Sequence, residues 1–153
     1  RYAETIAGSN LRERLLPGVT EAVLAAHHHG WAVGALTGNG RAVGEAKLRG
    51  VGLGMLISFG AWGDRAIERG HLVDEAIGAA LRATGVRYAP SETVLVGDTP
   101  ADIAAARLGG ARVVAVATGR FDLSALEPHR PDALLGDLSD TDLFVEAIDR
   151  ALG

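Results

Sequence analysis

The sequence predicts a doubly wound α/β fold, in which helices cover both faces of a parallel sheet. Two observations carry this prediction: strand-like apolar runs alternate with helical patterns, and the runs are continuously apolar. Continuous apolarity is typical of strands that are buried on both faces, and alternation with helices favours parallel pairing. The chain has 153 residues, of which 48% are hydrophobic, which is enough material for one core.

Helices are expected where apolar residues recur at helical spacing. The first follows Pro17-Gly18 and stops at Gly30, and the clearest one ends before Gly85. Asp140 or Thr141 suits the N-cap of the last helix. The predicted helices cover residues 19–29, 41–49, 71–84, about 99–108, and the segment that follows residue 140.

Strands are expected where short apolar runs end in glycine, aspartate or threonine. The predicted strands cover residues 31–37, 53–59, 93–96, 112–117 and, as a short edge strand, 133–135. Ligands of such sheets bind outside the carboxyl ends of the strands, so the residues that close the strands are the first candidates for chemistry. Here they are Thr37, Asp98 and Thr118.

Composition excludes several classes of partner. The formal net charge is -4 and the basic residues are scattered, so neither nucleic acid nor an anionic membrane is an expected partner. The absence of cysteine excludes disulfides and thiolate metal sites, and suits a cytoplasmic protein. No apolar run approaches the roughly 20 residues that a membrane-spanning helix needs.

The strongest local signal is Gly97-Asp98-Thr99-Pro100-Ala101-Asp102. A carboxylate at the end of a strand and another in the first turn of the next helix can face one point. Mg²⁺ prefers oxygen ligands and keeps several waters, so these two carboxylates predict a magnesium site. The alternative is structural: Asp98 caps the helix and Asp102 complements the helix dipole.

A second signal is Leu36-Thr37-Gly38-Asn39 at the end of an earlier strand. A hydroxyl and exposed backbone N–H groups at a strand-to-helix turn form a phosphate-binding cradle. Lys47 follows on the next helix, where its ammonium group could reach the same phosphate. A lone lysine on a helix is otherwise simply solvated.

These motifs resemble the second, third and fourth motifs of phosphatases of the haloacid dehalogenase superfamily. The segments Leu16-Pro17-Gly18-Val19 and Gly60-Ala61-Trp62-Gly63-Asp64-Arg65 are similar to its phosphoglycolate-phosphatase-like branch. The resemblance implies Mg²⁺-dependent hydrolysis of a small phosphorylated metabolite through an aspartyl-phosphate. The implied roles are phosphoryl binding by Thr37, Gly38, Asn39 and Lys47, catalysis by Thr37, Lys47 and Asp98, and metal binding by Asp98 and Asp102.

One part of the family pattern has no counterpart. The Asp-x-Asp motif, which carries the nucleophile, should precede Leu16, where the only acidic residues are the isolated Glu4 and Glu13. Most of the helical cap is missing as well, so residues 1–14 are interpreted as its remnant and residues 15–153 as an incomplete core domain.

The missing motif has a structural consequence. In the family, the opening strand lies between the strands that end at Thr37 and Asp98, so its absence leaves two buried strand edges unpaired. Each unmet buried group costs about 1–3 kcal/mol. We therefore expect the intact protein to be longer, and this chain by itself to be inactive.

Three alternatives remain. Gly38-Asn39-Gly40-Arg41-Ala42-Val43-Gly44, with Asp64 further on, is close to a dinucleotide-binding fingerprint of an oxidoreductase. A non-catalytic binding or regulatory module fits the missing nucleophile. A phosphomutase would share the same motifs, whereas a dehalogenase would not need the metal-type aspartates. The substrate ester and the oligomeric state are left open.

Other conspicuous residues receive structural interpretations. Consecutive helical residues point in different directions, so His27, His28 and His29 are not expected to hold a metal. Trp62 is expected to pack rather than to contact substrate. A further short segment, Gly119, Arg120 and Asp122, follows a strand and is a candidate for the rim of the site.

Overall fold

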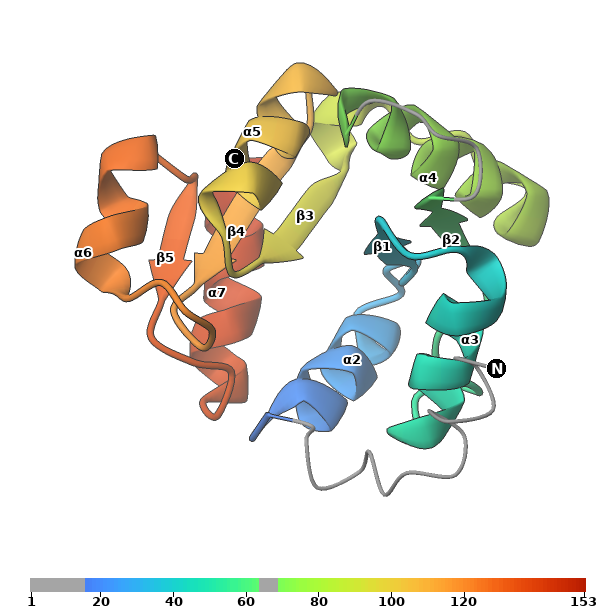
Figure 1. The fold of residues 1–153 in the computed structure, drawn as a ribbon, viewed down its shortest axis with the longest axis horizontal. Coiled ribbons are helices and arrows are strands. Elements are labelled where there is room, and N and C mark those ends of the chain that lie inside the picture. The colour runs from blue at the N-terminus through green and yellow to red at the C-terminus, as the bar shows by residue number, and fades with distance from the viewer. Residues whose placement is uncertain (1–15, 64–68) are drawn as a thin grey trace.

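The computed structural model describes residues 16–63 and 69–153, and it has the α/β alternation that the sequence predicts (Figure 1). The elements in chain order are α2 (Val19–His28), β1 (Ala35–Thr37), α3 (Arg41–Gly50), β2 (Gly60–Trp62), α4 (Arg69–Thr84), the 3-10 helix η3 (Pro90–Glu92), β3 (Val94–Gly97), α5 (Pro100–Leu108), β4 (Arg112–Val116), α6 (Leu123–Leu126), the 3-10 helix η4 (Glu127–His129), β5 (Ala133–Leu135) and α7 (Thr141–Leu152).

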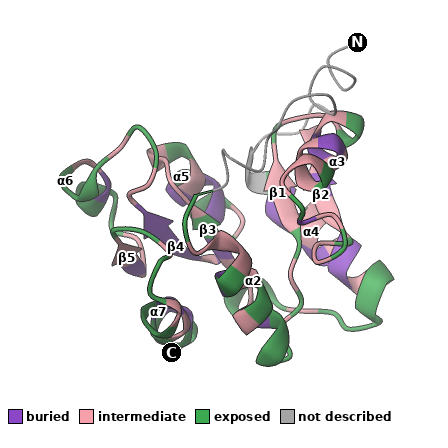
Figure 2. Ribbon diagram, turned by 90° about the horizontal axis from the view of Figure 1, so that it is seen from below, coloured by how far each residue is buried: buried purple, intermediate pink, exposed green. Residues whose placement is uncertain are grey.

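All strand pairs in the described residues are parallel, but the strands form two sheets. β1 pairs with β2, with Thr37 opposite Trp62. β3, β4 and β5 form the other sheet in that order, with Gly97 opposite Ala115. Figures 1 and 2 show β1 and β3 as the neighbouring edges of the two sheets. Within the described residues neither edge has a strand partner on the side that faces the other sheet.

The three-stranded sheet is covered on both faces, which explains the continuous apolarity of β4. Successive side chains of a strand point to opposite faces. Val113 and Ala115 pack in one buried cluster, whereas Val114 packs in another. The first cluster includes residues from α4 and α5, namely Val73, Ile77, Ile103 and Ala106. The second includes residues from α2 and α7, namely Ala22, Phe144, Ala147, Ile148 and Ala151 (Figure 2).

The predicted strand over residues 53–59 is wrong. This segment is a turn and an irregular stretch, and the strand β2 begins only at Gly60. The backbone N–H groups of Leu56 and Ile57 both donate to the carbonyl of Leu53, so the run satisfies part of its hydrogen bonding locally. Met55 is 98% exposed. An apolar run by itself does not distinguish a strand from a turn of this kind.

The other elements differ from expectation mainly at their ends. β1 occupies only the last three residues of the predicted 31–37 strand. Asp140 is the N-cap of α7, where its carboxylate accepts a hydrogen bond from the Leu143 N–H at 3.1 Å. The short helix α6 was not predicted, although its cap Asp122 is visible in the sequence. Residues 1–14, interpreted as a cap remnant, lie outside the described residues, as does Asp64 of the dinucleotide-type pattern.

Among the described helices, none is both long and apolar enough to cross a membrane.

Candidate active site

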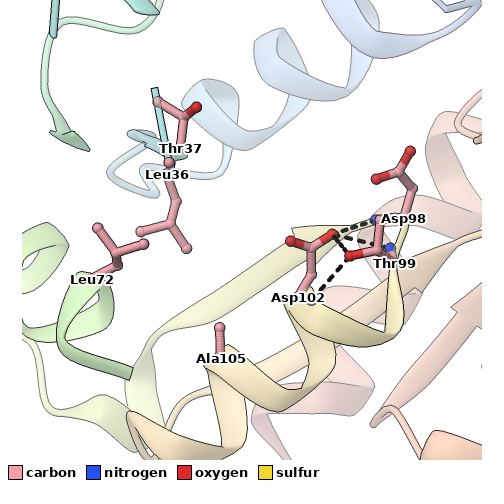
Figure 3. Close-up of a pocket in the computed structure, with 8 residues that line it drawn as sticks. Leu36, Thr37, Leu72, Asp98, Thr99, Asp102 and Ala105 are labelled. Carbon is pink, nitrogen blue, oxygen red and sulfur yellow. Dashed lines mark hydrogen bonds between the residues drawn. The ribbon is translucent and has the colours of Figure 1, made fainter. Parts of the chain in front are cut away.

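A cavity of about 280 Å³ lies where the edges of the two sheets approach each other (Figure 3). Its walls come from β1 and the turn after it, from α4, and from the junction of β3 with α5. The lining residues are Leu36, Thr37, Gly38, Leu72, Asp98, Thr99, Asp102 and Ala105. The fold therefore brings Thr37 and Gly38 to the same cavity as Asp98 and Asp102, although the two motifs are far apart in the sequence.

The two aspartates lie at the start of α5, in a segment from Gly97 to Asp102 that is held together by hydrogen bonds between near neighbours. We call this segment the capping unit. Thr99 is the N-cap, and its hydroxyl accepts a hydrogen bond from the Asp102 N–H at 3.1 Å. In return, the Asp102 carboxylate accepts one from the Thr99 N–H at 3.0 Å. This reciprocal pair is a capping box, and Pro100 fits the first helical position. The alternative in which Asp98 caps the helix is therefore wrong, because Thr99 has that position.

Asp102 also holds the backbone at the end of β3. Its Oδ2 atom accepts three hydrogen bonds, from the Asp98 N–H at 3.1 Å, the Thr99 N–H at 3.0 Å and the Thr99 hydroxyl at 2.9 Å. Bonds to a charged acceptor are stronger than neutral ones. Figure 3 shows the other carboxylate oxygen turned toward the side where Leu36 and Thr37 lie. Asp102 thus orients Asp98 through the main chain.

This capping role gives a stability prediction. Asp102→Ala is expected to lower the free energy of unfolding by about 1–3 kcal/mol, because α5 loses its capping box and N–H groups lose their acceptor. Urea unfolding measures the change. Asp142→Ala is the matched control. Asp142 is also an acidic residue in the first turn of a helix, but the N-cap hydrogen bond of α7 is accepted by Asp140. Equal effects of the two substitutions would contradict the capping role.

The carboxylate of Asp98 is arranged differently. It is partly buried, lines the cavity and projects away from the hydrogen bonds around Asp102 (Figure 3). Over residues 16–63 and 69–153, the structure contains no hydrogen bond or ion pair to this carboxylate. A partly buried charge without a protein partner is costly, and a bound cation would offset that cost.

The donor set fits magnesium better than an ion that needs a full protein cage. In the part of the chain that the structure describes, no group of three or more histidine, cysteine, aspartate or glutamate residues could hold a metal. Among the described residues that line the cavity, Asp98 and Asp102 are the ones that carry a carboxylate. Mg²⁺ is commonly bound by one or two carboxylates together with waters and substrate phosphate, so two carboxylates suffice.

Thr37 has a hydroxyl whose acceptor capacity is already used. Its Oγ1 atom accepts hydrogen bonds from the backbone N–H of Asn39 at 3.1 Å and from the Asn39 side-chain amide at 3.0 Å. A hydroxyl has two acceptor lone pairs and one donor hydrogen, so only the hydrogen remains for another partner. The Thr37 hydroxyl is therefore set to donate, which suits an anionic oxygen. Asn39 does not line the cavity, but it holds the Thr37 hydroxyl through these two hydrogen bonds.

Lys47 is not among the residues that line the cavity. It lies in the second half of α3, six residues after Arg41, which places its backbone about 9 Å further along the helix axis. Gly44, one turn earlier, faces Trp62 and Thr37. The role of Lys47 in binding the phosphoryl group therefore stays a prediction.

The other conspicuous residues have structural surroundings. His27 bonds through Nε2 to the carbonyl oxygen of Leu56 at 2.6 Å, and the ring of His29 stacks on Trp31 with centroids 4.9 Å apart. His27 and His29 therefore have separate partners, and the ring of His28 contacts that of His29 edge-on, with centroids 6.1 Å apart. Trp62 belongs to β2 rather than to a loop, and its ring packs closely against Gly44 and Gly60.

Of the three residues suggested for the rim, Asp122 has a local structural role. It caps α6 and bonds to the Ser124 hydroxyl at 2.8 Å and the Ala125 N–H at 2.9 Å. The hydrogen bond from Ser124, and then that from Ala125, lowers the pKa of its carboxyl group. Thr118 and Gly119 lie in the turn after β4.

Sequence reasoning missed four lining residues. Thr99 could have been found, because a threonine three residues before an aspartate is a capping-box signal. Leu36, Leu72 and Ala105 carry no such signal, since they become lining residues only through the packing of β1, α4 and α5 around the cavity.

Comparison with known proteins addresses the second half of the chain. Residues 69–141 match a family model described as HAD-hydrolase-like, a span that runs from α4 to the start of α7 and includes Asp98 and Asp102. No curated protein matches the chain. The match covers slightly less than half of the chain and, with the parallel α/β architecture, agrees with the resemblance to the haloacid dehalogenase superfamily.

Proposed function

We propose that the protein hydrolyses a small phosphate monoester with the help of Mg²⁺, as a phosphatase of the phosphoglycolate-phosphatase-like kind. The proposal depends on one observation: Thr37 and Asp98 line the same cavity. The Thr37 hydroxyl can donate a hydrogen bond there, and the Asp98 carboxylate has no partner among the described residues. A small phosphorylated metabolite in the cytoplasm is the corresponding substrate.

The β1 side of the cavity suits the phosphoryl group. Thr37 donates its hydroxyl hydrogen to a phosphoryl oxygen, and Gly38 lines the cavity next to it. A side chain larger than hydrogen at residue 38 would meet nothing within 4 Å, so the turn leaves open space beside Thr37. Backbone N–H groups at such a strand-to-helix turn commonly bind phosphate.

The β3 side suits the metal. Asp98 would be a direct ligand, and Asp102 would support the ion directly or through water while it holds the Asp98 main chain. When bound, Mg²⁺ would offset the negative charge of the phosphoryl oxygens. Lys47 of α3 would contribute a positive charge that stabilises the phosphoryl group and the nucleophile.

The nucleophile is proposed to come from a strand between β1 and β3. Both strands have an unpaired edge there within the described residues, and the family resemblance assigns the Asp-x-Asp motif to a strand at this place. One carboxylate would attack phosphorus to form an aspartyl-phosphate while the alcohol leaves with a proton. Water would then cleave the acyl phosphate, release inorganic phosphate and restore the carboxylate.

A second candidate is a non-catalytic binding module. It is favoured by one observation: the described residues that line the cavity offer the two aspartates of the capping unit and no further carboxylate. Such a module would bind phosphate and Mg²⁺ without turnover.

A panel of small phosphate monoesters distinguishes the two. Phosphate release is measured with the full-length protein, with Mg²⁺ and after its removal by a chelator. A phosphatase is expected to release phosphate from at least one ester, at a rate that falls to background with the chelator and recovers with Mg²⁺. Binding of inorganic phosphate without any turnover would favour the module, and turnover unaffected by the chelator would contradict the role of the metal.

A further inference from the structure

The carboxylate of Asp98 lies directly against a glycine from another part of the sheet. Gly119 follows β4 in the turn that leads to α6, whereas Asp98 follows β3. A Cβ atom placed on Gly119 would overlap Oδ2 of Asp98 and would lie 3.1 Å from its Cγ. The three heavy atoms nearest to that position all belong to Asp98.

The backbone itself does not require glycine at this position. Gly119 is absent from the glycines with positive φ, which include Gly110 and Gly85. It is also exposed, so no tightly packed interior surrounds it. Among the residues that the structure describes, the demand for glycine at residue 119 therefore comes from the space that the Asp98 carboxylate occupies.

The two aspartates are held in different ways. Oδ2 of Asp102 accepts three hydrogen bonds, which fix its carboxylate. The Asp98 carboxylate has no such bond from the described residues, so its orientation depends on the surfaces that it touches. The surface of Gly119 is one of them.

We propose that Gly119 is a positioning residue for Asp98, because its lack of a side chain lets the carboxylate keep the orientation in which it lines the cavity. The inference rests on the proposed function, in which Asp98 binds a divalent cation. Mg²⁺ requires near-ideal octahedral geometry, so a small rotation of one ligand weakens binding. The same rotation costs little folding stability, since only the end of a partly exposed side chain moves.

The test uses the full-length protein and its Gly119→Ala and Gly136→Ala variants. Gly136 is the matched control: it also follows a strand, is exposed, and has no atom within 4 Å of an added Cβ. Binding of Mn²⁺ is followed by electron paramagnetic resonance, with Mg²⁺ as the competitor. Thermal unfolding is recorded in metal-free buffer.

Gly119→Ala is expected to raise the dissociation constant of the cation about tenfold or more, as changes in the support of a metal ligand commonly do. Its metal-free melting temperature is expected to stay within about 1 °C of the parent protein, below the roughly 2–4 °C shift that a loss of 1 kcal/mol gives in a domain of this size. Gly136→Ala is expected to change neither quantity.

Two other outcomes overturn the inference. If the parent protein binds the cation and Gly119→Ala binds it equally well, Gly119 does not position Asp98, while the metal site itself stands. If Gly119→Ala melts at a much lower temperature without metal, the glycine is needed for folding instead. A parent protein that binds no cation removes the proposed function, and this inference with it.

Discussion

Replacing Asp98 with asparagine is expected to abolish most Mg²⁺-dependent phosphate release while the protein stays folded. The amide is neutral and nearly isosteric, so the cavity keeps its shape but loses the charge that would bind the ion. Because changes in the support of a ligand already cost 10- to 100-fold, loss of the ligand charge is expected to lower kcat/KM by about 100-fold or more. Steady-state kinetics over a range of Mg²⁺ concentrations measures the effect.

The matched control for this substitution is Asp149→Asn. Asp149 is an exposed aspartate on α7, and α7 packs on the face of the three-stranded sheet opposite to that covered by α4 and α5. The control also removes one negative charge, but it is expected to leave kcat/KM unchanged. Circular dichroism of both variants checks that they are folded. Full activity of a folded Asp98→Asn protein would refute the metal role of Asp98.

Replacing Thr37 with valine is expected to weaken phosphate recognition. Valine keeps the shape of threonine but has no hydroxyl, so a phosphoryl oxygen loses a donor, and the two N–H groups of Asn39 lose their acceptor. A hydrogen bond to a charged group contributes about 1.5–3 kcal/mol, which corresponds to a loss of roughly 10- to 150-fold in kcat/KM. The binding of inorganic phosphate, measured by calorimetry, is expected to weaken as well.

Thr37→Ser is the control, because serine retains the hydroxyl and both of its acceptor lone pairs. It is expected to keep most of the activity and of the phosphate affinity. If Thr37→Val keeps the activity and the phosphate affinity of the parent protein, the donor role of the hydroxyl is wrong.

The two halves of the site differ in how far they could be predicted. The unit from Gly97 to Asp102 depends on neighbours three or four residues apart, and its carboxylates, its proline and its helix start are all visible in the sequence. One detail of the structural alternative differs: it placed the cap at Asp98, and Asp98 and Thr99 are both good N-cap residues that differ by one position. The hydrogen bonds decide in favour of Thr99.

The β1 half was harder to predict. Lys47 has the expected spacing from Thr37, but spacing along the chain does not state in which direction α3 runs after its turn. Gly44 lets α3 lie close to Trp62 and Thr37, a contact that the spacing does not reveal. The same limitation applies to the run over 53–59, whose apolarity is equally compatible with a strand and with the turn that forms.

The sequence by itself determined the α/β class, the positions of most helices, the capping unit of α5 and the two motifs that resemble a phosphatase, since these depend on periodicity and on short-range hydrogen bonds. Only the tertiary structure decided that Thr37 and Asp98 share one cavity, and that Gly119 lies against the Asp98 carboxylate. The physical reason is that such contacts join residues far apart in the chain, and their geometry follows from how the helices pack on the two sheets.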